Sequence, residues 1–539
     1  MIGQLETGTA GSSEALLAIE VVFSLLVAAT GLAVLARRLG LPYPILLVAG
    51  GLLLGLVPGL PRVELEPELV FLLFLPPILF AAGYFTSIRD FRANARKILL
   101  LAVALVLVTA AAVGFVVQAL VPGVGWPVAF ALGAIVAPPD AIAATAVFRR
   151  LGVPRRIVTI LEGESLINDA TALVTFRTAL AVAAGSALTL SELAADFVVV
   201  AVVGLVVGLV VGVAVAWVTA RIGDPVFAIV ITFIAPVASY LPAELLGGSG
   251  VLSTVTAGIW LGTHAPRNFT SEMRVAGLAA WQVLLFLINS VVFILIGLQL
   301  PAVIGELSGR PLADLLGLAA AVCLTVVVVR IAWVYLSIYV PYLVRPSLLL
   351  GERLPSSRYV FLVAWAGMRG VVSLAAALSL PFVLGDGTPF PERSLLIFLA
   401  FSVILVTLVG QGLTLPLIVR WLGLESDGRD EAEEEHQARQ LAAQAAVQRI
   451  DELAEQWPDH RPLIDTLRAL YTHRASHIEQ DKPQTEAEQE IIEHRQIRHA
   501  VIEAEREALL RLREEGGISD EVFRRVERDL DLEELRMEA

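Results

Sequence analysis

The stretch Leu161-Glu162-Gly163-Glu164-Ser165-Leu166-Ile167-Asn168-Asp169-Ala170 lies inside a long apolar segment of this 539-residue chain. It is far too polar for a helix that faces lipid, because an ionisable side chain at the centre of a bilayer costs roughly 3 kcal/mol or more. Four of its polar residues are spaced to share one face of a helix: Glu164, Ser165, Asn168 and Asp169. The stretch therefore predicts a transmembrane helix whose polar face meets protein or water.

Asp169 is the leading candidate for an ion-carrying residue. At a rise of about 1.5 Å per residue, it lies roughly 18 Å from the start of the segment at Ile157, near the middle of a bilayer. Buried carboxylates at this depth commonly mark ion or proton pathways, and the alternative is an aspartate satisfied by hydrogen bonds between helices. Glu162 lies nearer the end of the segment, and we expect it to point elsewhere as an interfacial or structural carboxylate.

The preceding apolar segment contains Ala137-Pro138-Pro139-Asp140-Ala141, which predicts a break in a transmembrane helix. Two adjacent prolines remove two N–H donors and clash with the preceding turn. Broken transmembrane helices leave carbonyl groups and half-helix ends free, and transporters use these groups to hold ions near the midplane. Asp140 lies beside the positive end of the second half-helix, so we expect it either to cap that helix or to bind a cation.

A second break is predicted at Gly367-Met368-Arg369-Gly370, where glycines flank an arginine inside another apolar segment. Two breaks in corresponding segments are typical of an inverted repeat. Arg369 is then suited to neutralise helix ends where the two broken helices cross. Arg330 is a third intramembrane charge and needs a partner, for which Glu164 is the leading candidate, in a pair that organises the site.

The composition of the whole chain is that of an all-α polytopic membrane protein. Hydrophobic residues make up 57% of the chain against 17% charged, and the mean hydropathy is +0.76. A bilayer core about 30 Å thick needs roughly 20 apolar residues per helix. Scanning for such runs predicts about thirteen transmembrane segments, at approximately 15–36, 42–60, 67–86, 98–120, 127–148, 157–184, 193–219, 225–243, 248–264, 278–300, 312–341, 356–384 and 393–419. If segments 1–6 and 8–13 are the repeats, the two breaks fall in the equivalent segments 5 and 12.

The charges of the loops predict the orientation. With the N-terminus outside, the inside loops hold 17 Arg and Lys residues, and the outside loops hold three, Arg62, Arg310 and Arg393. This alternation follows the positive-inside rule and favours an odd number of spans. The first residues lack the basic region and cleavage site of a signal peptide, so we expect the first segment to be retained. The C-terminus is therefore predicted to lie in the cytoplasm.

The composition changes at Glu425, which predicts a transmembrane domain at 1–424 and an acidic helical tail at 425–539. Up to this point there are 23 Arg and Lys against 21 Asp and Glu, whereas the tail has 16 against 31. The tail carries the spaced apolar residues of amphipathic helices, and Trp457-Pro458 and Asp481-Lys482-Pro483 are expected to break it into three pieces. We interpret it as a solvated cytoplasmic appendage, and a regulatory or dimer-stabilising domain is the alternative.

With these residues the chain resembles the monovalent cation/proton antiporters, specifically the bacterial cation:proton antiporter-1 type, the branch that includes the eukaryotic sodium/proton exchangers. The resemblance spans roughly 15–424. Its most specific parts are Pro138-Pro139-Asp140 and the stretch 161–170. Leu75-Pro76-Pro77-Ile78 and Gly367-Met368-Arg369-Gly370 also look like family motifs.

The resemblance implies thirteen helices with an inverted repeat, a homodimer in the inner membrane of a bacterium, and an elevator-like movement of a six-helix core. It also implies that Asp169 alternately binds a proton and a cation such as sodium, in the service of pH and salt homeostasis. Further cation ligands are expected at Ser165, Asp140 and Asn168. Because Asn168 takes the place of a second aspartate found in electrogenic relatives, the resemblance implies electroneutral one-for-one exchange.

Two more residues enter through the resemblance. Glu164 and Arg330 resemble the buried ion pair of the family. Ala81 is a departure, because many members carry Asp or Glu at that place after the Pro76-Pro77 pair. This chain then lacks one ligand charge, so the preference among sodium, potassium and lithium does not carry over from relatives.

Other functions are less consistent with the sequence. A proton-coupled symporter of a small organic solute is the alternative, but the aromatic or amide side chains it needs do not cluster around 138–170. An enzyme is not expected, since no His-Glu-x-x-His or Gly-x-Ser-x-Gly motif accompanies the buried polar groups. The single cysteine, Cys323, excludes a disulfide framework and a cysteine-based metal site. We expect no cofactor, no nucleic-acid partner, and no bound metal other than a monovalent cation.

Overall fold

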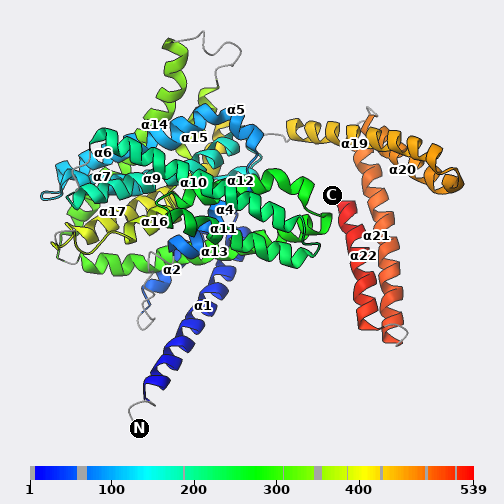
Figure 1. Cartoon of the computed structure of the whole chain (residues 1–539), viewed down its shortest axis with the longest axis horizontal. Coiled ribbons are helices and arrows are strands. Elements are labelled where there is room, and N and C mark those ends of the chain that lie inside the picture. Colours follow the sequence, from blue (N-terminus) through cyan, green and yellow to red (C-terminus); the bar gives the residue numbers. More distant parts are fainter. Residues whose placement is uncertain are drawn as a thin grey trace. The chain divides into compact units, whose positions relative to one another are not determined.

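The computed structural model describes residues 6–57, 70–185, 189–307, 309–344, 355–384, 387–424, 429–479, 484–515 and 519–538. Contacts divide the chain into two compact units, Met1–Ser426 and Asp427–Ala539. Both are helical in their described residues, and the labels below follow Figure 1.

The first unit holds the apolar helices. They are α1 (Glu6–Leu39), α2 (Tyr43–Gly55), the π-helical turn η1 (Val70–Phe74), α4 (Leu75–Phe85), α5 (Ile88–Leu99), the π-helical turn η2 (Leu100–Ala104), α6 (Leu105–Leu120), α7 (Trp126–Val136), α8 (Ala141–Arg150), α9 (Arg155–Ala183), α10 (Leu190–Thr219), α11 (Pro225–Leu245), α12 (Gly250–Asn268), α13 (Ser271–Glu306), α14 (Leu312–Val344), α15 (Ser357–Trp365), α16 (Val371–Leu378), α17 (Arg393–Leu405), the π-helical turn η4 (Val406–Gln411) and α18 (Gly412–Leu422). In its described residues, each of the thirteen segments predicted from the sequence overlaps one of these helices or consecutive ones.

Length and composition identify which helices suit a membrane. Within the described residues, eight continuous helical stretches are long and apolar enough to cross one, and two shorter apolar helices accompany them. The outer face of α10 is apolar as well, with Val198 57% and Val210 61% exposed, which suits contact with lipid. The all-helical membrane fold is therefore confirmed, whereas the count of thirteen crossings stays a prediction.

Glycines bring α2 and α13 into backbone contact. A methyl group on Gly51 of α2 would overlap the carbonyl of Ile294 in α13, and one on Gly55 would press against the carbonyl of Leu298. These residues are four apart on both helices, so the contact repeats along one turn of each. Small residues that permit such close approach are the usual basis of helix packing in membranes.

The same arrangement recurs between α12 and α4. Methyl groups on Gly258 and Gly262 of α12 would overlap the carbonyls of Phe80 and Tyr84 in α4. The spacing is again four residues on each helix. In the proposed repeat α2 corresponds to α12 and α4 to α13, so the two contacts are equivalent. This reciprocity agrees with the inverted repeat expected from the two breaks.

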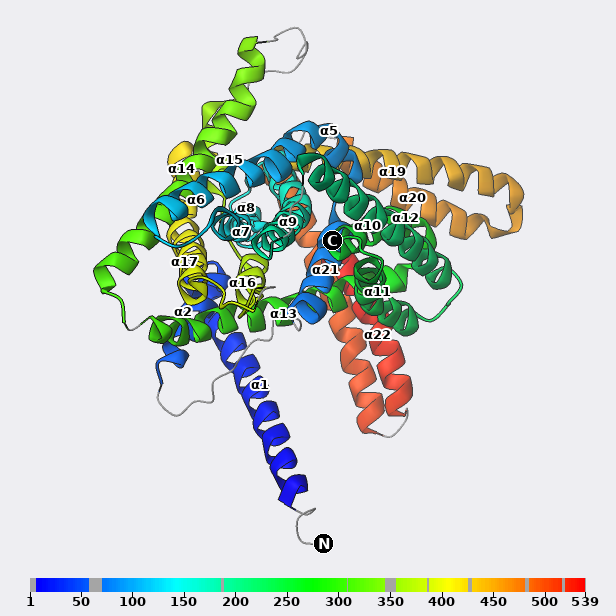
Figure 2. The same cartoon turned by 60° about the vertical axis from the view of Figure 1, so that its left-hand side comes forward.

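The helices of the first unit form two groups, seen in Figure 2. The core group contains α5 to α9 and α14 to α18, with α7, α9 and α16 packed against one another. The wall group contains α1, α2, α4 and α10 to α13. Fewer contacts join the two groups, chiefly from α13 to α16 and α17 and from α4 and α12 to α9. The candidate site lies along this boundary.

The second unit contains α19 (Arg429–Gln456), the 3-10 turn η5 (Pro458–His460), α20 (Arg461–Glu479), α21 (Gln484–Glu514) and α22 (Asp520–Glu538). They form two hairpins, α19 with α20 and α21 with α22. The expected break at Trp457-Pro458 is present, and the one at 481–483 lies outside the described residues. The prediction of three pieces is wrong, because α21 and α22 are separate helices. The Gly516-Gly517 pair between them is the signal that the prediction missed.

Candidate functional site

The two predicted breaks meet in space. The first separates α7 from α8 at 137–140, and the second separates α15 from α16 at 366–370. The backbone N–H of Asp140 donates to the carbonyl of Met368 at 2.6 Å, so the two extended segments are in direct contact. Four half-helix ends therefore converge on one point, two with free N–H groups and two with free carbonyl groups.

Asp140 occupies the N-terminal ends at this crossing. Its Oδ1 accepts the N–H of Ile142 at 2.8 Å, which caps α8. Its other oxygen lies against Gly370 at the start of α16, so closely that a methyl group on Gly370 would overlap it. The amide of Val371 also faces this carboxylate. An anion is thereby placed beside the positive ends of two half-helices.

Arg369 occupies the C-terminal ends. Its Nε donates to the carbonyl of Val136 at 3.0 Å, and its Nη2 to the carbonyl of Ala137 at 3.4 Å, both at the end of α7. Nη1 donates to the carbonyl of Gly367 in its own segment. The side chain is only 1% exposed. Arg369 thus supplies the positive charge and the donors that the end of α7 lacks.

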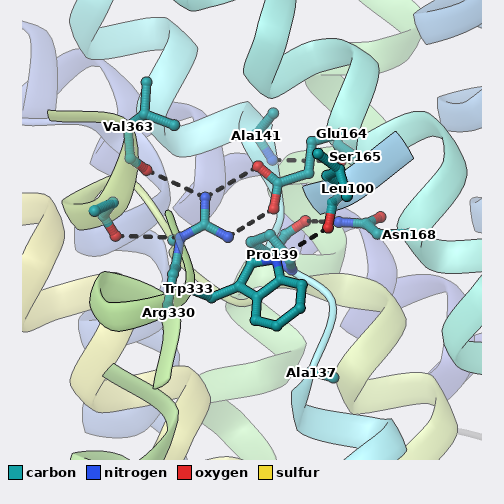
Figure 3. A network of polar contacts seen from close by, with 12 residues as sticks. Leu100, Ala137, Pro139, Ala141, Glu164, Ser165, Asn168, Arg330, Trp333 and Val363 are labelled. Atoms are coloured by element: carbon teal, nitrogen blue, oxygen red, sulfur yellow. Dashed lines mark hydrogen bonds and ion pairs between the residues drawn. The ribbon is translucent and has the colours of Figure 1, made fainter. Parts of the chain in front are cut away.

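Arg330 and Glu164 form an ion pair away from solvent (Figure 3). Nη1 of Arg330 donates to Oε1 of Glu164 at 2.6 Å and Nη2 to Oε2 at 3.0 Å, and both side chains are 1% exposed. The same guanidinium donates to the carbonyls of Ala364 and Val363 at 3.2 Å each. The bidentate pair therefore also caps the end of α15.

Asn168 and Ser165, which belong to the same stretch 161–170 of α9, contact the first break. Nδ2 of Asn168 donates to the carbonyl of Pro139 at 2.8 Å, and the N–H of Ala141 donates to Oγ of Ser165 at 3.4 Å (Figure 3). Pro138 and Pro139 have no N–H, so side chains of α9 hold this segment in place of a helical ladder. Oδ1 of Asn168 is buried without a partner among the described residues.

A cavity of about 450 Å³ opens onto the crossing. The core group lines it with Asp140, Ser165 and Asp169, and the wall group lines it from α2, α4 and α13. Asp169 is 7% exposed. At one end of the cavity Arg149 and Glu162 form an ion pair of 2.8 Å. The cavity therefore connects two regions. One is the C-terminal end of α8 and the first turns of α9, where the exposed ion pair lies, and the other is the carboxylates at the crossing.

The structure corrects two expectations about α9. Glu162 does not point elsewhere, because it lines the cavity together with Ser165 and Asp169, although its partly exposed ion pair with Arg149 agrees with the expected interfacial carboxylate. Residues three, four and seven apart share a helix face, so this alignment was readable from the spacing. The four polar residues of the stretch do not share one face: Glu164 and Asn168 lie on an adjacent stripe that meets Arg330 and Pro139.

Some lining residues were not singled out by the sequence reasoning. Asn289 on α13 and Ser373 on α16 line the cavity, and so does Tyr43 on α2. Asn289-Ser290 is a polar pair inside an apolar segment, and that was the available signal. Ala81 lines the cavity as well. Within the described residues, no group of three or more His, Cys, Asp or Glu side chains is arranged to hold a metal ion.

This arrangement defines the class of protein. Two broken helices cross at a buried carboxylate, and the carboxylate faces a cavity between two groups of membrane helices, as in secondary transporters of small ions. The family model described as "Sodium/hydrogen exchanger, transmembrane" matches residues 22–421. The chain belongs to this family of membrane transporters.

Similar proteins that match most of the chain support this family assignment. An uncharacterized sodium/proton exchanger of Mycobacterium tuberculosis is 36% identical and covers 98% of both chains. The sodium, potassium, lithium and rubidium/proton antiporter of Bacillus subtilis is 32% identical, over 89% of this chain and 72% of its own. The structure of the sodium proton antiporter MjNhaP1 from Methanocaldococcus jannaschii matches with a TM-score of 0.57 at 19% identity. That match covers 77% of this chain and all of MjNhaP1. The fold is therefore that of MjNhaP1.

Proposed function

We propose that this protein exchanges sodium or another monovalent cation for protons across a membrane, and that Asp169 carries the two ions alternately. One observation supports this assignment above the others. Of the carboxylates at the crossing and in the cavity, Glu164 is paired with Arg330, Glu162 is paired with Arg149, and Asp140 caps α8. Asp169 faces the cavity and has no hydrogen bond or ion pair within the described part of the chain. It is the carboxylate left available to an ion.

The substrate class rests on the relatives. The Bacillus subtilis protein is named for antiport of sodium, potassium, lithium and rubidium, and that of Aphanothece halophytica, 32% identical over 76% of this chain, for sodium. A hard alkali cation prefers oxygen ligands, which carboxylate, hydroxyl and carbonyl groups supply. Asp169 and Ser165 on α9 provide the first two kinds, with the backbone beside Asp140 and the amide oxygen of Asn168 as further candidates.

The exchange cycle follows from having a single available carboxylate. Either a proton or a monovalent cation neutralises Asp169, and the two exclude each other. An uncompensated charge is costly to move through a membrane, so the core group crosses past the wall group only when Asp169 is occupied. Glu164 and Arg330 remain paired throughout and add no net charge. Movement of the core group in one direction with a cation and in the other with a proton gives antiport.

Asn168 determines the charge balance in this proposal. It is neutral, and its amide is held by the carbonyl of Pro139, so one cation exchanges for one proton. Electroneutral exchange is independent of the membrane potential. Clamping the potential of vesicles with potassium and valinomycin is therefore expected to leave the sodium-driven rate unchanged, and acceleration by an imposed potential would contradict the one-for-one ratio.

The remaining organisation is proposed on the same basis. Residues 1–424 form the membrane domain of a multi-pass inner-membrane protein, with the N-terminus outside, as the loop charges favour. Residues 425–539 form a helical domain in the cytoplasm. The homodimer is carried over from the family resemblance alone. The protein acts as a transporter without enzymatic activity, and its exchange serves pH and salt homeostasis.

The test is collapse of a respiration-generated pH gradient in inside-out vesicles from an antiporter-deficient host. Sodium, potassium and lithium are added separately to the wild type and to Asp169→Asn, and a dye reports the gradient. We expect at least one cation to collapse the gradient in the wild type and the response to fall at least about a hundredfold in Asp169→Asn. The reason is that a neutral amide neither binds a proton nor balances a cation.

Asp224→Asn is the matched control. Asp224 is exposed and caps α11 through the N–H of Val226, and asparagine caps a helix equally well. We expect wild-type exchange from this variant. Appreciable exchange by Asp169→Asn would refute the assignment of the carrier. No response of folded wild-type protein to any of the three cations across several pH values would refute cation/proton exchange itself.

A further inference from the structure

Two buried polar atoms in the cavity have no role in the site as described so far. In the described part of the chain, six buried side-chain oxygen atoms lack a hydrogen-bond partner. Two of them belong to residues that line the cavity, Asn289 through Oδ1 and Ser373 through Oγ. Asn289 is 6% exposed and Ser373 is 1% exposed. A buried polar atom without a partner costs roughly 1–3 kcal/mol, so these two atoms require a partner inside the cavity, which water or a bound ion supplies.

The two residues reach the cavity from different groups of helices. Ser373 lies in the first turn of α16, just after the Gly370 and Val371 backbone that faces Asp140. Asn289 lies in the middle of α13 in the wall group, and the hydroxyl of Tyr43 lies beside its amide. The carboxylate of Asp169 completes the set from α9. The oxygen atoms therefore come from both groups of helices.

The number of oxygen ligands makes these atoms relevant to the cation. Hard cations in proteins gather roughly six or more oxygen atoms. Asp169 supplies at most two and Ser165 one, while Asp140 already accepts the Ile142 amide and Ala81 has no side-chain oxygen. Carbonyl and hydroxyl oxygens are ligands of the same hard kind.

We propose that Oδ1 of Asn289 and Oγ of Ser373 are ligands of the transported monovalent cation, and that Asn289 sets its selectivity from the wall side of the cavity. The inference rests on the proposed antiport at Asp169. Asn289 contributes an oxygen without a second negative charge, so Asp169 remains the sole carboxylate that exchanges its proton. Because Asn289 belongs to the wall group, it does not move with the core group. It therefore contacts the cation only while the core group holds Asp169 in this cavity.

Asn289→Leu tests the proposal, because leucine keeps the size of the side chain and removes the oxygen. In inside-out vesicles, we expect the apparent KM for sodium to rise about tenfold and the preference among sodium, lithium and potassium to flatten. The maximal rate is expected to stay within about twofold, since Asp169 is unchanged. Ser373→Ala is expected to raise the KM about threefold, and Ser373→Thr, which restores the hydroxyl, to recover it.

Ser290→Ala is the matched control. Ser290 is adjacent to Asn289, is 1% exposed and has an unpartnered Oγ, but it does not line the cavity. We expect its KM values to equal those of the wild type. Each variant is compared at equal abundance of monodisperse protein.

The outcomes separate this inference from the proposed function. Wild-type exchange with unchanged KM and ion preference in Asn289→Leu and Ser373→Ala would overturn the inference and leave antiport intact. A rise of KM in Ser290→Ala as large as that in Asn289→Leu would also overturn it, by showing a general packing effect. Absence of exchange in the wild type would instead refute the antiport on which the inference rests. If Asn289→Leu is not monodisperse, the Ser373→Ala and Ser373→Thr pair decides.

Discussion

The two breaks at the crossing occupy equivalent segments of the chain and have opposite chemistry. The first is Pro138-Pro139-Asp140, and its charged residue is an acid beside the N-terminal ends of α8 and α16. The second is Gly367-Met368-Arg369-Gly370, and its charged residue is a base on the carbonyls that end α7. Each charge has the sign that the adjacent half-helix ends require. An inverted repeat therefore conserves the backbone geometry here while the side chains follow the local dipoles.

The two breaks also arise by different means. Prolines make the first, because they cannot donate to a helical ladder wherever they are placed. The second depends on what packs against it: a methyl group on Gly367 would overlap the side chain of Arg330, and one on Gly370 would overlap Asp140. The first break therefore arises from its own residues. The second requires the charged side chains of Arg330 and Asp140 to approach the backbone closely.

Removing Arg330 is expected to have the largest effect on the second break. Arg330→Ala leaves Glu164 charged and buried and removes the donors to Val363 and Ala364. Breaking one partner out of a buried pair costs about 3–5 kcal/mol. We expect a large loss of folded protein, measured by fluorescence-detected gel filtration and thermal unfolding in detergent.

Arg310→Ala is the control for that variant, because Arg310 pairs with Glu392 at 2.6 Å but is 38% exposed. An exposed pair contributes roughly 0–1 kcal/mol, so the control is expected to resemble the wild type. Wild-type abundance and unfolding temperature in Arg330→Ala would contradict a structural role for the pair and would leave the second break dependent on its own glycines.

Gly370→Ala is expected to have an intermediate effect, because it tests the close approach itself. The new methyl group would overlap the carboxylate of Asp140, and overpacking of this kind typically costs about 1–3 kcal/mol. Both the unfolding temperature and the exchange rate are expected to fall. Gly410→Ala in η4 is the control, since nothing lies within 4 Å of its added carbon. Equal behaviour of the two variants would show that the crossing is looser than this contact implies.

Much of the fold and part of the site could be predicted from the sequence, because both depend on local features of the chain. Apolar segments of membrane length and a proline pair act locally, so the helices and the first break follow from composition and chain geometry. The partners Glu164 and Arg330 were readable because few other charges lie in the membrane segments. The three-piece tail was wrong because the glycine pair before α22 was overlooked.

The positions of Glu162 and Asn289 were missed for two different reasons. Glu162 is aligned with Asp169 by helical spacing, a pattern that its position nearer the end of the segment does not reveal. Asn289 is brought to the cavity by packing of α13 along α2, which depends on glycine contacts between segments more than 200 residues apart. No local pattern contains that information, so only the assembled helices bring Asn289 to the cavity that Asp169 also lines.

The smallest effect on stability is expected from Asp140→Asn. This variant distinguishes the two roles expected for Asp140, a helix cap and a cation ligand. Asparagine keeps the oxygen that caps α8 but loses the second acceptor that faces the amide of Val371, so the unfolding free energy is expected to fall by about 0.5–1 kcal/mol, less than in Gly370→Ala. The charge beside α8 and α16 is nevertheless lost, and we expect the apparent KM for sodium to rise severalfold in the vesicle assay. An unchanged KM would make Asp140 a cap alone. The matched change at the other break, Arg369→Gln, is expected to lower the unfolding temperature instead, because the carbonyls of Val136 and Ala137 lose their charged donor.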